Sequence, residues 1–267
     1  MHIAVCAKQV PSPEIAPGVY GVMEDGRGIR LPAGSPHVMS PFDEQAVEAA
    51  LRIRESIGQV RITVITLGPE SARAVVRHGL SLGADDGVLL SDAAFEDSDS
   101  YATAVALAAA IRKLGYCELV LCGRQAADSD AGAVGAGIAE LLEAPLVTFA
   151  RDVRIEGGFV RVERVLEDGF ETIEAELPAV VTVSNELGAV RAPNLRETMR
   201  AARKPVAVWS PADLGLAAGQ VGAAAARQVR ERVYIPVKES RCEFIEGGSP
   251  AAQAALLVQR LAEAKLL

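Results

Sequence analysis

Short apolar runs rich in β-branched residues alternate with longer helical stretches over the first 150 residues. The runs predict four strands that are buried on both faces, at residues 2–10, 60–67, 87–91 and 118–122. The spacing of apolar residues predicts helices between and after them, at residues 41–57, 70–82, 101–114 and 132–143. Strands that alternate with helices imply right-handed crossovers, so we expect an α/β fold with a doubly wound, mostly parallel sheet.

The pattern changes after Pro145. Further strands are expected at residues 146–154, 159–165, 170–176 and 179–184, with hairpin turns at Gly157-Gly158 and Asp168-Gly169. They predict an antiparallel extension at the edge of the sheet or a small side layer. The remaining segments expected are a basic loop with a short helix at 189–204, a strand at 234–238 and an amphipathic helix at 250–265. We divide the chain into an α/β domain, residues 1–205, and a C-terminal arm, residues 206–267, that contacts a partner.

The charge and composition exclude several classes of protein. Thirty-five Asp and Glu against 27 Lys and Arg give a formal charge of −8, which argues against a nucleic-acid-binding face. Half of the residues are hydrophobic, which excludes a disordered chain. No apolar run approaches the ~18–20 residues that cross a bilayer, and the first residues predict a strand rather than a signal peptide. Cys6, Cys117, Cys122 and Cys242 form no CxxC pair, which favours reduced thiols and a cytoplasmic location.

Catalytic and metal-binding motifs find no support in the sequence. Residues 79–83 match G-x-S-x-G, but a helix precedes the serine and a strand follows it, the reverse of a hydrolase turn, so we expect a helix end. The three histidines are scattered and the spacing of Cys117 and Cys122 does not suit zinc, so no metal site is expected. Cysteines within apolar strands are interpreted as small buried side chains. No titratable pair stands out as acid and base, so no catalytic residue is predicted.

Residues 123–135 carry the most chemical information, because they follow the fourth strand directly and lead into a helix. If the first and fourth strands are the central pair, this loop and residues 7–9 face one crevice beyond the carboxyl ends of the strands. The helix start offers unpaired N–H groups to a phosphate, and Arg124 adds positive charge. Gln125 and Asp128 can hydrogen-bond a ribose or a base, so a nucleotide suits the loop better than inorganic phosphate. A capped polar turn with a surface arginine explains the same residues equally well.

Four stretches of sequence point together to one family: residues 3–10, residues 40–44, residues 123–135, and residues 162–173 with 177–183. In combination they resemble the β subunit of electron-transfer flavoproteins over nearly the whole chain. The resemblance implies an adenine-nucleotide-binding, Rossmann-like domain and an α/β heterodimer whose redox FAD lies mainly in the α subunit, near the interface. The chain would be an electron carrier subunit rather than an enzyme by itself. It would pass electrons from flavin-dependent, acyl-CoA-type dehydrogenases to a quinone reductase or another acceptor.

The resemblance also implies which residues hold a nucleotide in this subunit. They are Cys6, Ala7, Lys8, Ser40, Pro41, Phe42, Asp43, Leu67, Gly123, Arg124, Gln125, Ala126, Ala127, Asp128, Ser129, Asp130, Ala131, Gly132, Ala133 and Val134. Arg124, Ser129 and Val134 resemble the branch that holds a second FAD, which includes electron-bifurcating members. Ala127 and Ala133 depart from that branch. We therefore expect a second FAD here, with AMP as the alternative.

The basic loop after Arg191 resembles the family's partner-recognition loop. Leu195 falls where the family places an apolar anchor that inserts into the dehydrogenase, and Arg191, Arg196 and Arg200 flank it. An exposed leucine among arginines can combine a hydrophobic contact with charge steering. A solvated helix start is the plainer interpretation of the same residues.

Two other functions compete with the carrier. An adenine-nucleotide-binding module of the stress-protein kind, without a redox role, also fits the crevice. An adenylating enzyme would need a Ser-Gly-Gly-x-Asp loop after the first strand, which residues 7–11 do not provide.

Overall fold

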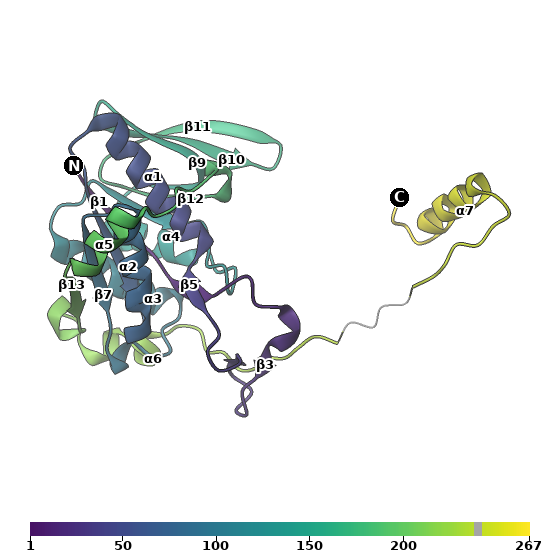
Figure 1. The fold of residues 1–267 in the computed structure, drawn as a ribbon, viewed down its shortest axis with the longest axis horizontal. Coiled ribbons are helices and arrows are strands. Elements are labelled where there is room, and N and C mark those ends of the chain that lie inside the picture. Colours follow the sequence, from purple (N-terminus) through teal and green to yellow (C-terminus); the bar gives the residue numbers. More distant parts are fainter. Residues whose placement is uncertain (238–241) are drawn as a thin grey trace.

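The computed structural model describes residues 1–237 and 242–267, and its centre is a twisted sheet with helices on both faces (Figure 1). The sheet has nine strands in the order β11-β10-β9-β12-β8-β1-β6-β7-β13. Their bounds are β1 His2–Cys6, β6 Arg61–Leu67, β7 Asp86–Leu90, β8 Leu119–Gly123, β9 Leu146–Glu156, β10 Phe159–Leu166, β11 Gly169–Glu176, β12 Ala179–Val183 and β13 Val206–Trp209. The seven strands from β9 to β13 in this order pair in parallel, which confirms the doubly wound α/β fold.

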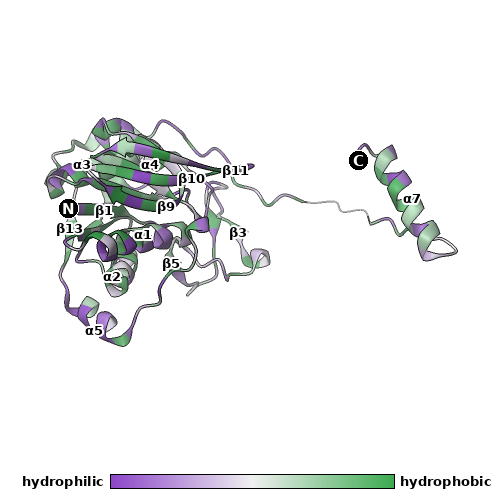
Figure 2. Ribbon diagram, turned by 90° about the horizontal axis from the view of Figure 1, so that it is seen from above, coloured by the Kyte–Doolittle hydropathy of each residue, from purple (hydrophilic) through white to green (hydrophobic). Residues whose placement is uncertain are grey.

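The helices of the described residues are α1 Pro41–Ile57, α2 Arg73–Leu82, α3 Ser100–Leu114, α4 Ala133–Leu142, α5 Leu195–Arg203, α6 Gly222–Ala225 and α7 Pro250–Glu263. Of these, α1 to α4 cover the two faces of the sheet. Apolar residues of α1 and α2 form one core with one face of the sheet, and those of α3 and α4 form a second core on the other face. In the view of Figure 2 the strands lie between these helix layers. Burial on both faces is why the central strands are continuous apolar runs.

Helix ends agree closely with the sequence pattern. Helices α1, α2 and α3 end at Gly58, Gly83 and Gly115, whose φ angles of 87°, 127° and 94° suit glycine. The G-x-S-x-G segment is therefore the end of α2, as predicted. Serine commonly caps helices through its hydroxyl, but at the start of α1 the Ser40 hydroxyl makes no capping bond, and the Ser40 backbone carbonyl accepts the N–H groups of Asp43 and Glu44 instead.

The long first strand predicted at residues 2–10 is divided in two. β1 ends at Cys6, and the chain then leaves the sheet to form β2 Gln9–Pro11, which pairs antiparallel with β5 His37–Met39. A second hairpin joins β3 Gly21–Val22 to β4 Ile29–Arg30. The break places Ala7 and Lys8 at the carboxyl end of β1, beside the sheet rather than within it.

The section after Pro145 is only partly antiparallel. β9, β10 and β11 form the expected antiparallel extension, but β12 inserts between β8 and β9 and runs parallel to both. The prediction of four antiparallel strands is therefore wrong for residues 179–183. All five residues of β12 are buried, and this two-sided burial is typical of a strand inside a parallel sheet.

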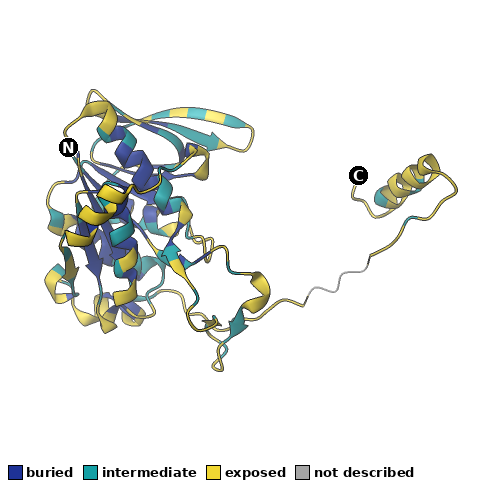
Figure 3. Ribbon diagram, in the orientation of Figure 1, coloured by how far each residue is buried: buried dark blue, intermediate teal, exposed yellow. Residues whose placement is uncertain are grey.

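The C-terminal segment begins inside the sheet and ends outside it. β13 pairs with β7 as an edge strand, so the first residues of the predicted arm belong to the sheet. The terminal helix is confirmed as α7, which has no buried residue and lies apart from the α/β body (Figures 1 and 3). Residues 234–237 form no strand, and Lys238 lies outside the described residues. The division at residue 205 and the partner contact of the arm stay predictions.

Within the described ranges, 1–237 and 242–267, no helix has the length and apolar character that a bilayer crossing requires.

Candidate functional site

The order of the central strands reverses between β1 and β8. β1 pairs with β6 on one side and with β8 on the other, where Cys6 lies opposite Cys122. Loops that follow such a pair of parallel strands diverge and leave a crevice at the carboxyl edge of the sheet. The loop after β1 and the loop after β8 therefore start at neighbouring positions on this edge, as predicted, and an ion pair between Lys8 and Asp128 joins them. We use "the crevice" for the region bordered by residues 6–8, 40–43 and 123–134.

Asp43 joins the two sides of the crevice. Its carboxylate accepts the backbone N–H of Lys8 at 2.7 Å and that of Gly123 at 3.0 Å. The side chain is buried, and burial raises its pKa to about 7 although both N–H bonds favour the ionised form. A Cβ on Gly123 would lie 2.4 Å from the Asp43 carboxylate, so residue 123 must be glycine for this contact. The structure thus places Asp43 as a bridge between loops.

The loop after β8 is organised by its own polar side chains. Lys8 Nζ forms an ion pair with Asp128 at 2.7 Å, and Gln125 Nε2 donates to Asp130 Oδ1 at 2.7 Å. The N–H of Asp130 bonds back to the carbonyl of Ala126, which curls residues 126–130 into a compact turn. Asp130 has a φ of 53°, a conformation that Asp adopts more readily than most residues. The polar groups predicted to contact a nucleotide therefore lie together at the crevice.

Two features of the crevice suit an anionic, hydroxyl-bearing ligand. Helix α4 starts after Gly132, and among residues 1–237 and 242–267 no side chain caps it, so its first N–H groups can bind an anion. The Ser40 hydroxyl is fully buried next to the crevice and has no hydrogen-bond partner within the described chain. A buried hydroxyl without a hydrogen-bond partner is rare in folded proteins unless a ligand or a water molecule binds it. Lys8 and Arg124 supply positive charge, so these residues fit a nucleotide.

Arg124 lies against residues that sequence reasoning missed. Its guanidinium donates to Ser184 Oγ at 3.1 Å and to Asn185 Oδ1 at 3.4 Å, just after β12. The guanidinium carbon is 5.3 Å from the centre of the Phe42 ring and 5.7 Å from that of Phe149. No pattern in the sequence reveals Ser184, Asn185 and Phe149 as neighbours of Arg124, because their positions depend on β12 lying beside β8.

The small residues and cysteines near the crevice pack tightly. A Cβ on Gly135 would lie 2.7 Å from Thr182, so this glycine lets α4 lie close on β12. Cys6, Cys117 and Cys122 are buried, as predicted, and Cys242 is exposed. A hydrogen bond with Cys122, together with burial, raises the pKa of the Cys6 thiol. Leu67 ends β6 at the same edge and packs on the core of α3 and α4. In the part of the chain that the structure describes, no three acidic, His or Cys side chains are placed to hold a metal.

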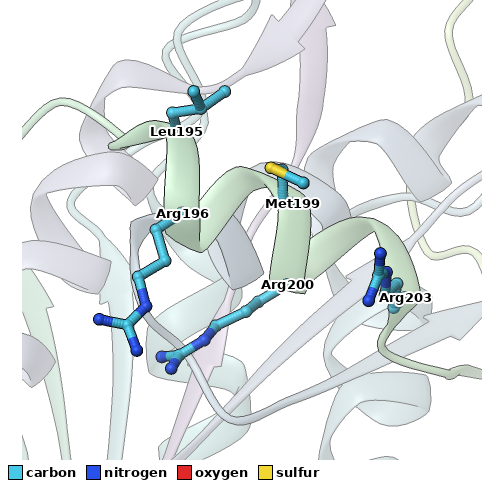
Figure 4. Close-up of a pocket in the computed structure, with 5 residues that line it drawn as sticks. All are labelled: Leu195, Arg196, Met199, Arg200 and Arg203. Carbon is cyan, nitrogen blue, oxygen red and sulfur yellow. The ribbon is translucent and has the colours of Figure 1, made fainter.

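Helix α5 presents the predicted recognition residues (Figure 4). Leu195, its first residue, is 78% exposed, and Met199 one turn later is 56% exposed. Both line a shallow cavity of about 470 Å³ together with Arg196, Arg200 and Arg203. Met199 was missed, although its spacing of four residues from Leu195 on a basic helix could have revealed it.

Arg191 differs from the other predicted recognition residues, because it is tied to α1. Its guanidinium forms ion pairs with Glu48 at 2.7 Å and with Glu55 at 2.6 Å. Glu48 is buried and also receives a bond from Arg52 at 2.8 Å. Burial alone would raise the pKa of Glu48, but the bonds from Arg191 and Arg52 outweigh it and lower that pKa. The structure therefore shows Arg191 holding the segment that leads into α5.

Comparisons with known proteins agree with this geometry. The family model described as "Electron transfer flavoprotein domain" matches residues 32–214. The caffeyl-CoA reductase-Etf complex subunit CarD of Acetobacterium woodii is 36% identical over the full length of both chains. The electron transfer flavoprotein subunit beta of Megasphaera elsdenii is 36% identical over 90% of this chain and 89% of the relative.

A third relative has a different name but the same extent of similarity. The protein FixA of Azorhizobium caulinodans is 33% identical over 97% of this chain and 93% of the relative. The family model covers more than half of the chain, and each of these relatives exceeds 30% identity over most of its length. The chain therefore belongs to the electron transfer flavoprotein family, as a subunit of the β type.

Proposed function

We propose that the crevice binds an adenine nucleotide and that the chain works as one half of a heterodimeric electron carrier whose redox flavin is held mainly by an α subunit. The observation that carries the proposal is the conjunction, at the β1–β8 switch point, of the uncapped start of α4 with the buried, unpartnered hydroxyl of Ser40. Membership of the family implies a flavin in the complex and an α-type partner.

Five polar side chains of the crevice have stated roles in this proposal. The first N–H groups of α4, with Lys8 and Arg124, would hold the phosphates, while Gln125 and Asp128 would bond the sugar or the base. Lys8 forms an ion pair with Asp128 in this chain. A phosphate would replace Asp128 as the partner of Lys8, so the positive charge of Lys8 would stay paired. Asp43 would fix the loops that border the ligand, through the two N–H groups that its carboxylate accepts. A bound flavin supplies the electron-transfer chemistry, and the protein supplies its position and its electrostatic environment.

The nucleotide of this subunit is proposed to be a second FAD, with AMP as the alternative. Arg124, Ser129 and Val134 support FAD. A relative that matches over its full length is named as a subunit of a reductase-Etf complex, which agrees with a role in a larger redox assembly. The chain itself would carry electrons from acyl-CoA-type, flavin-dependent dehydrogenases to a quinone reductase or another acceptor, rather than catalyse a reaction alone.

Helix α5 is proposed to dock the electron-donating partner, and the C-terminal arm to contact the α subunit. Leu195 and Met199 give α5 an apolar contact, and Arg196, Arg200 and Arg203 surround it with positive charge. Such an arrangement steers an acidic partner and then buries an apolar anchor. Leu257 and Val258 on α7 are 45% and 57% exposed, and their burial against another chain would explain why this helix carries apolar residues.

The test is to purify the chain together with its α subunit and to count FAD and AMP per heterodimer. Two FAD per heterodimer would support the proposed second FAD, and one FAD with one AMP would support the alternative. Arg124→Ala should lower the nucleotide content, whereas Arg151→Ala, which also removes an arginine stacked on a phenylalanine ring, should not. A colourless complex, or a crevice that holds no nucleotide, would contradict the proposal.

A further inference from the structure

Phe149 has an unusual backbone conformation for a bulky residue. Its φ is +58°, in the left-handed region that large side chains rarely adopt. A conformation of this kind is strained and persists only where the surrounding structure enforces it, which is often at binding sites.

The cause of this conformation is a β-bulge between β9 and β12. Val147 pairs with Val181 and Ala150 with Val183, so residues 148 and 149 together face the single residue Thr182. The N–H of Phe149 donates to Thr182 Oγ1 at 3.1 Å. The bulge lies level with the end of β12, at the same carboxyl edge of the sheet as the crevice. A bulge re-aims the side chain of the extra residue.

Phe149 is one of two rings beside Arg124. The guanidinium lies 5.3 Å from the Phe42 ring and 5.7 Å from the Phe149 ring, and Ser184 and Asn185 hold it in place. Phe149 is 39% exposed, so a large part of its side chain is open to solvent in this chain. The rings of Phe42 and Phe149 and the guanidinium of Arg124 thus lie together at the edge of the crevice. Planar heteroaromatic rings stack on aromatic side chains and on guanidinium groups.

We propose that Phe149 is a ring-stacking residue of the crevice, which with Phe42 packs against the planar heteroaromatic ring of a bound nucleotide, beside the Arg124 guanidinium. The inference rests on the proposed function, because it presumes that a nucleotide binds there. The ring is either an adenine or an isoalloxazine, and both have the same stacking chemistry. The bulge gives the side chain of Phe149 a direction that regular pairing with β12 would not give it. The Phe149 ring therefore lies beside the Arg124 guanidinium.

Phe170 offers a matched control elsewhere in the same sheet. It lies on β11, far along the strand order from β8, and Arg151 stacks over its ring at 4.1 Å. Phe170 is 54% exposed. It therefore shares the ring, the stacked arginine and the exposure of Phe149, but it lies away from the crevice.

The experiment titrates AMP and FAD into the α/β heterodimer after its flavin and nucleotide have been removed. Phe149→Gly suits the left-handed backbone, and its thermal midpoint is measured beside its affinity so that lost binding is distinguished from misfolding. Loss of one stacked ring should weaken binding about tenfold, and Phe149→Trp should restore it. Weaker binding of both ligands identifies adenine, whereas weaker binding of FAD alone identifies isoalloxazine.

Binding of both ligands within twofold of the native affinity by Phe149→Gly would overturn the inference, and so would an equal loss in Phe170→Ala. These outcomes leave the proposed function intact, because the native heterodimer would still bind its nucleotide. A native heterodimer that binds neither AMP nor FAD would contradict both proposals.

Discussion

Replacing Asp43 with Asn tests the bridge across the crevice. Burial raises the pKa of Asp43 from 3.8 to about 7, so the folded protein holds this proton more tightly than the unfolded chain does. The raised pKa therefore adds stability below about pH 4, and this stability is lost as the pH rises to about 7. Each unit of difference in pKa between the folded and the unfolded state corresponds to about 1.4 kcal/mol. The titration of Asp43 should therefore lower the free energy of unfolding by up to about 4 kcal/mol over this pH range.

The amide side chain of the Asp43→Asn variant would carry no charge at any pH. It would keep one acceptor oxygen for Lys8 or Gly123 and would turn an NH₂ group toward the other N–H, which costs about 1–3 kcal/mol. The variant should therefore be less stable than the native chain at pH 4–5. The difference should shrink or reverse toward pH 8.

The assay is urea unfolding of both chains at several pH values from 4 to 8. Asp128→Asn is the control, because Asp128 forms an ion pair with Lys8 while 28% exposed, and its loss should cost no more than about 1 kcal/mol. If Asp43→Asn and the native chain gave parallel curves of stability against pH, the assignment of a buried, titrating bridge would be refuted.

Three further substitutions test other parts of the structure. Gly123→Ala should lower the free energy of unfolding by more than about 2 kcal/mol in thermal or urea unfolding, because its Cβ would lie 2.4 Å from the Asp43 carboxylate, whereas Gly169→Ala meets no atom within 4 Å and should have little effect. Glu48→Gln should lower the free energy of unfolding by about 3 kcal/mol at neutral pH. The loss should be smaller below about pH 4, because protonation of Glu48 in the native chain already removes the stability that its lowered pKa provides. An equal loss at both pH values would contradict the buried ion pairs. Leu195→Ala with Met199→Ala should leave the melting temperature unchanged and slow flavin reduction by a partner dehydrogenase about tenfold. Tyr116→Ala is the control, because Tyr116 lies before β8 and its exposed fraction is between those of Leu195 and Met199; it should not slow the reduction.

The sequence predicts the centre of the fold well, because each feature there has a local cause. Glycines with positive φ end α1, α2 and α3 where the apolar spacing stops. The position of residues 123–135 after a buried strand predicts that they face the loop after β1 if β1 and β8 are neighbours, which the structure shows. The buried cysteines follow from their place in apolar strands.

The parts that could not be predicted depend on contacts between distant segments. The apolar run at 179–183 is compatible with an antiparallel or a parallel strand, so the sequence does not reveal that β12 lies beside β8. The contacts of Arg124 with Ser184 and Phe149 depend on that pairing and were missed with it. The attachment of Arg191 to Glu48 was missed because the two residues are 143 positions apart.

The position of β12 has a consequence for the order in which the sheet can be completed during synthesis. β9, β10 and β11 are made before β12, yet β12 is their one connection, within the described sheet, to β8 and the strands beyond it. Until residue 183 has left the ribosome, the nascent chain holds two incomplete sheets with open edges at β8 and β9. Open edges of this kind pair readily with other chains. A polypeptide that stops before Ala179 should therefore aggregate, even though it contains every residue that borders the crevice.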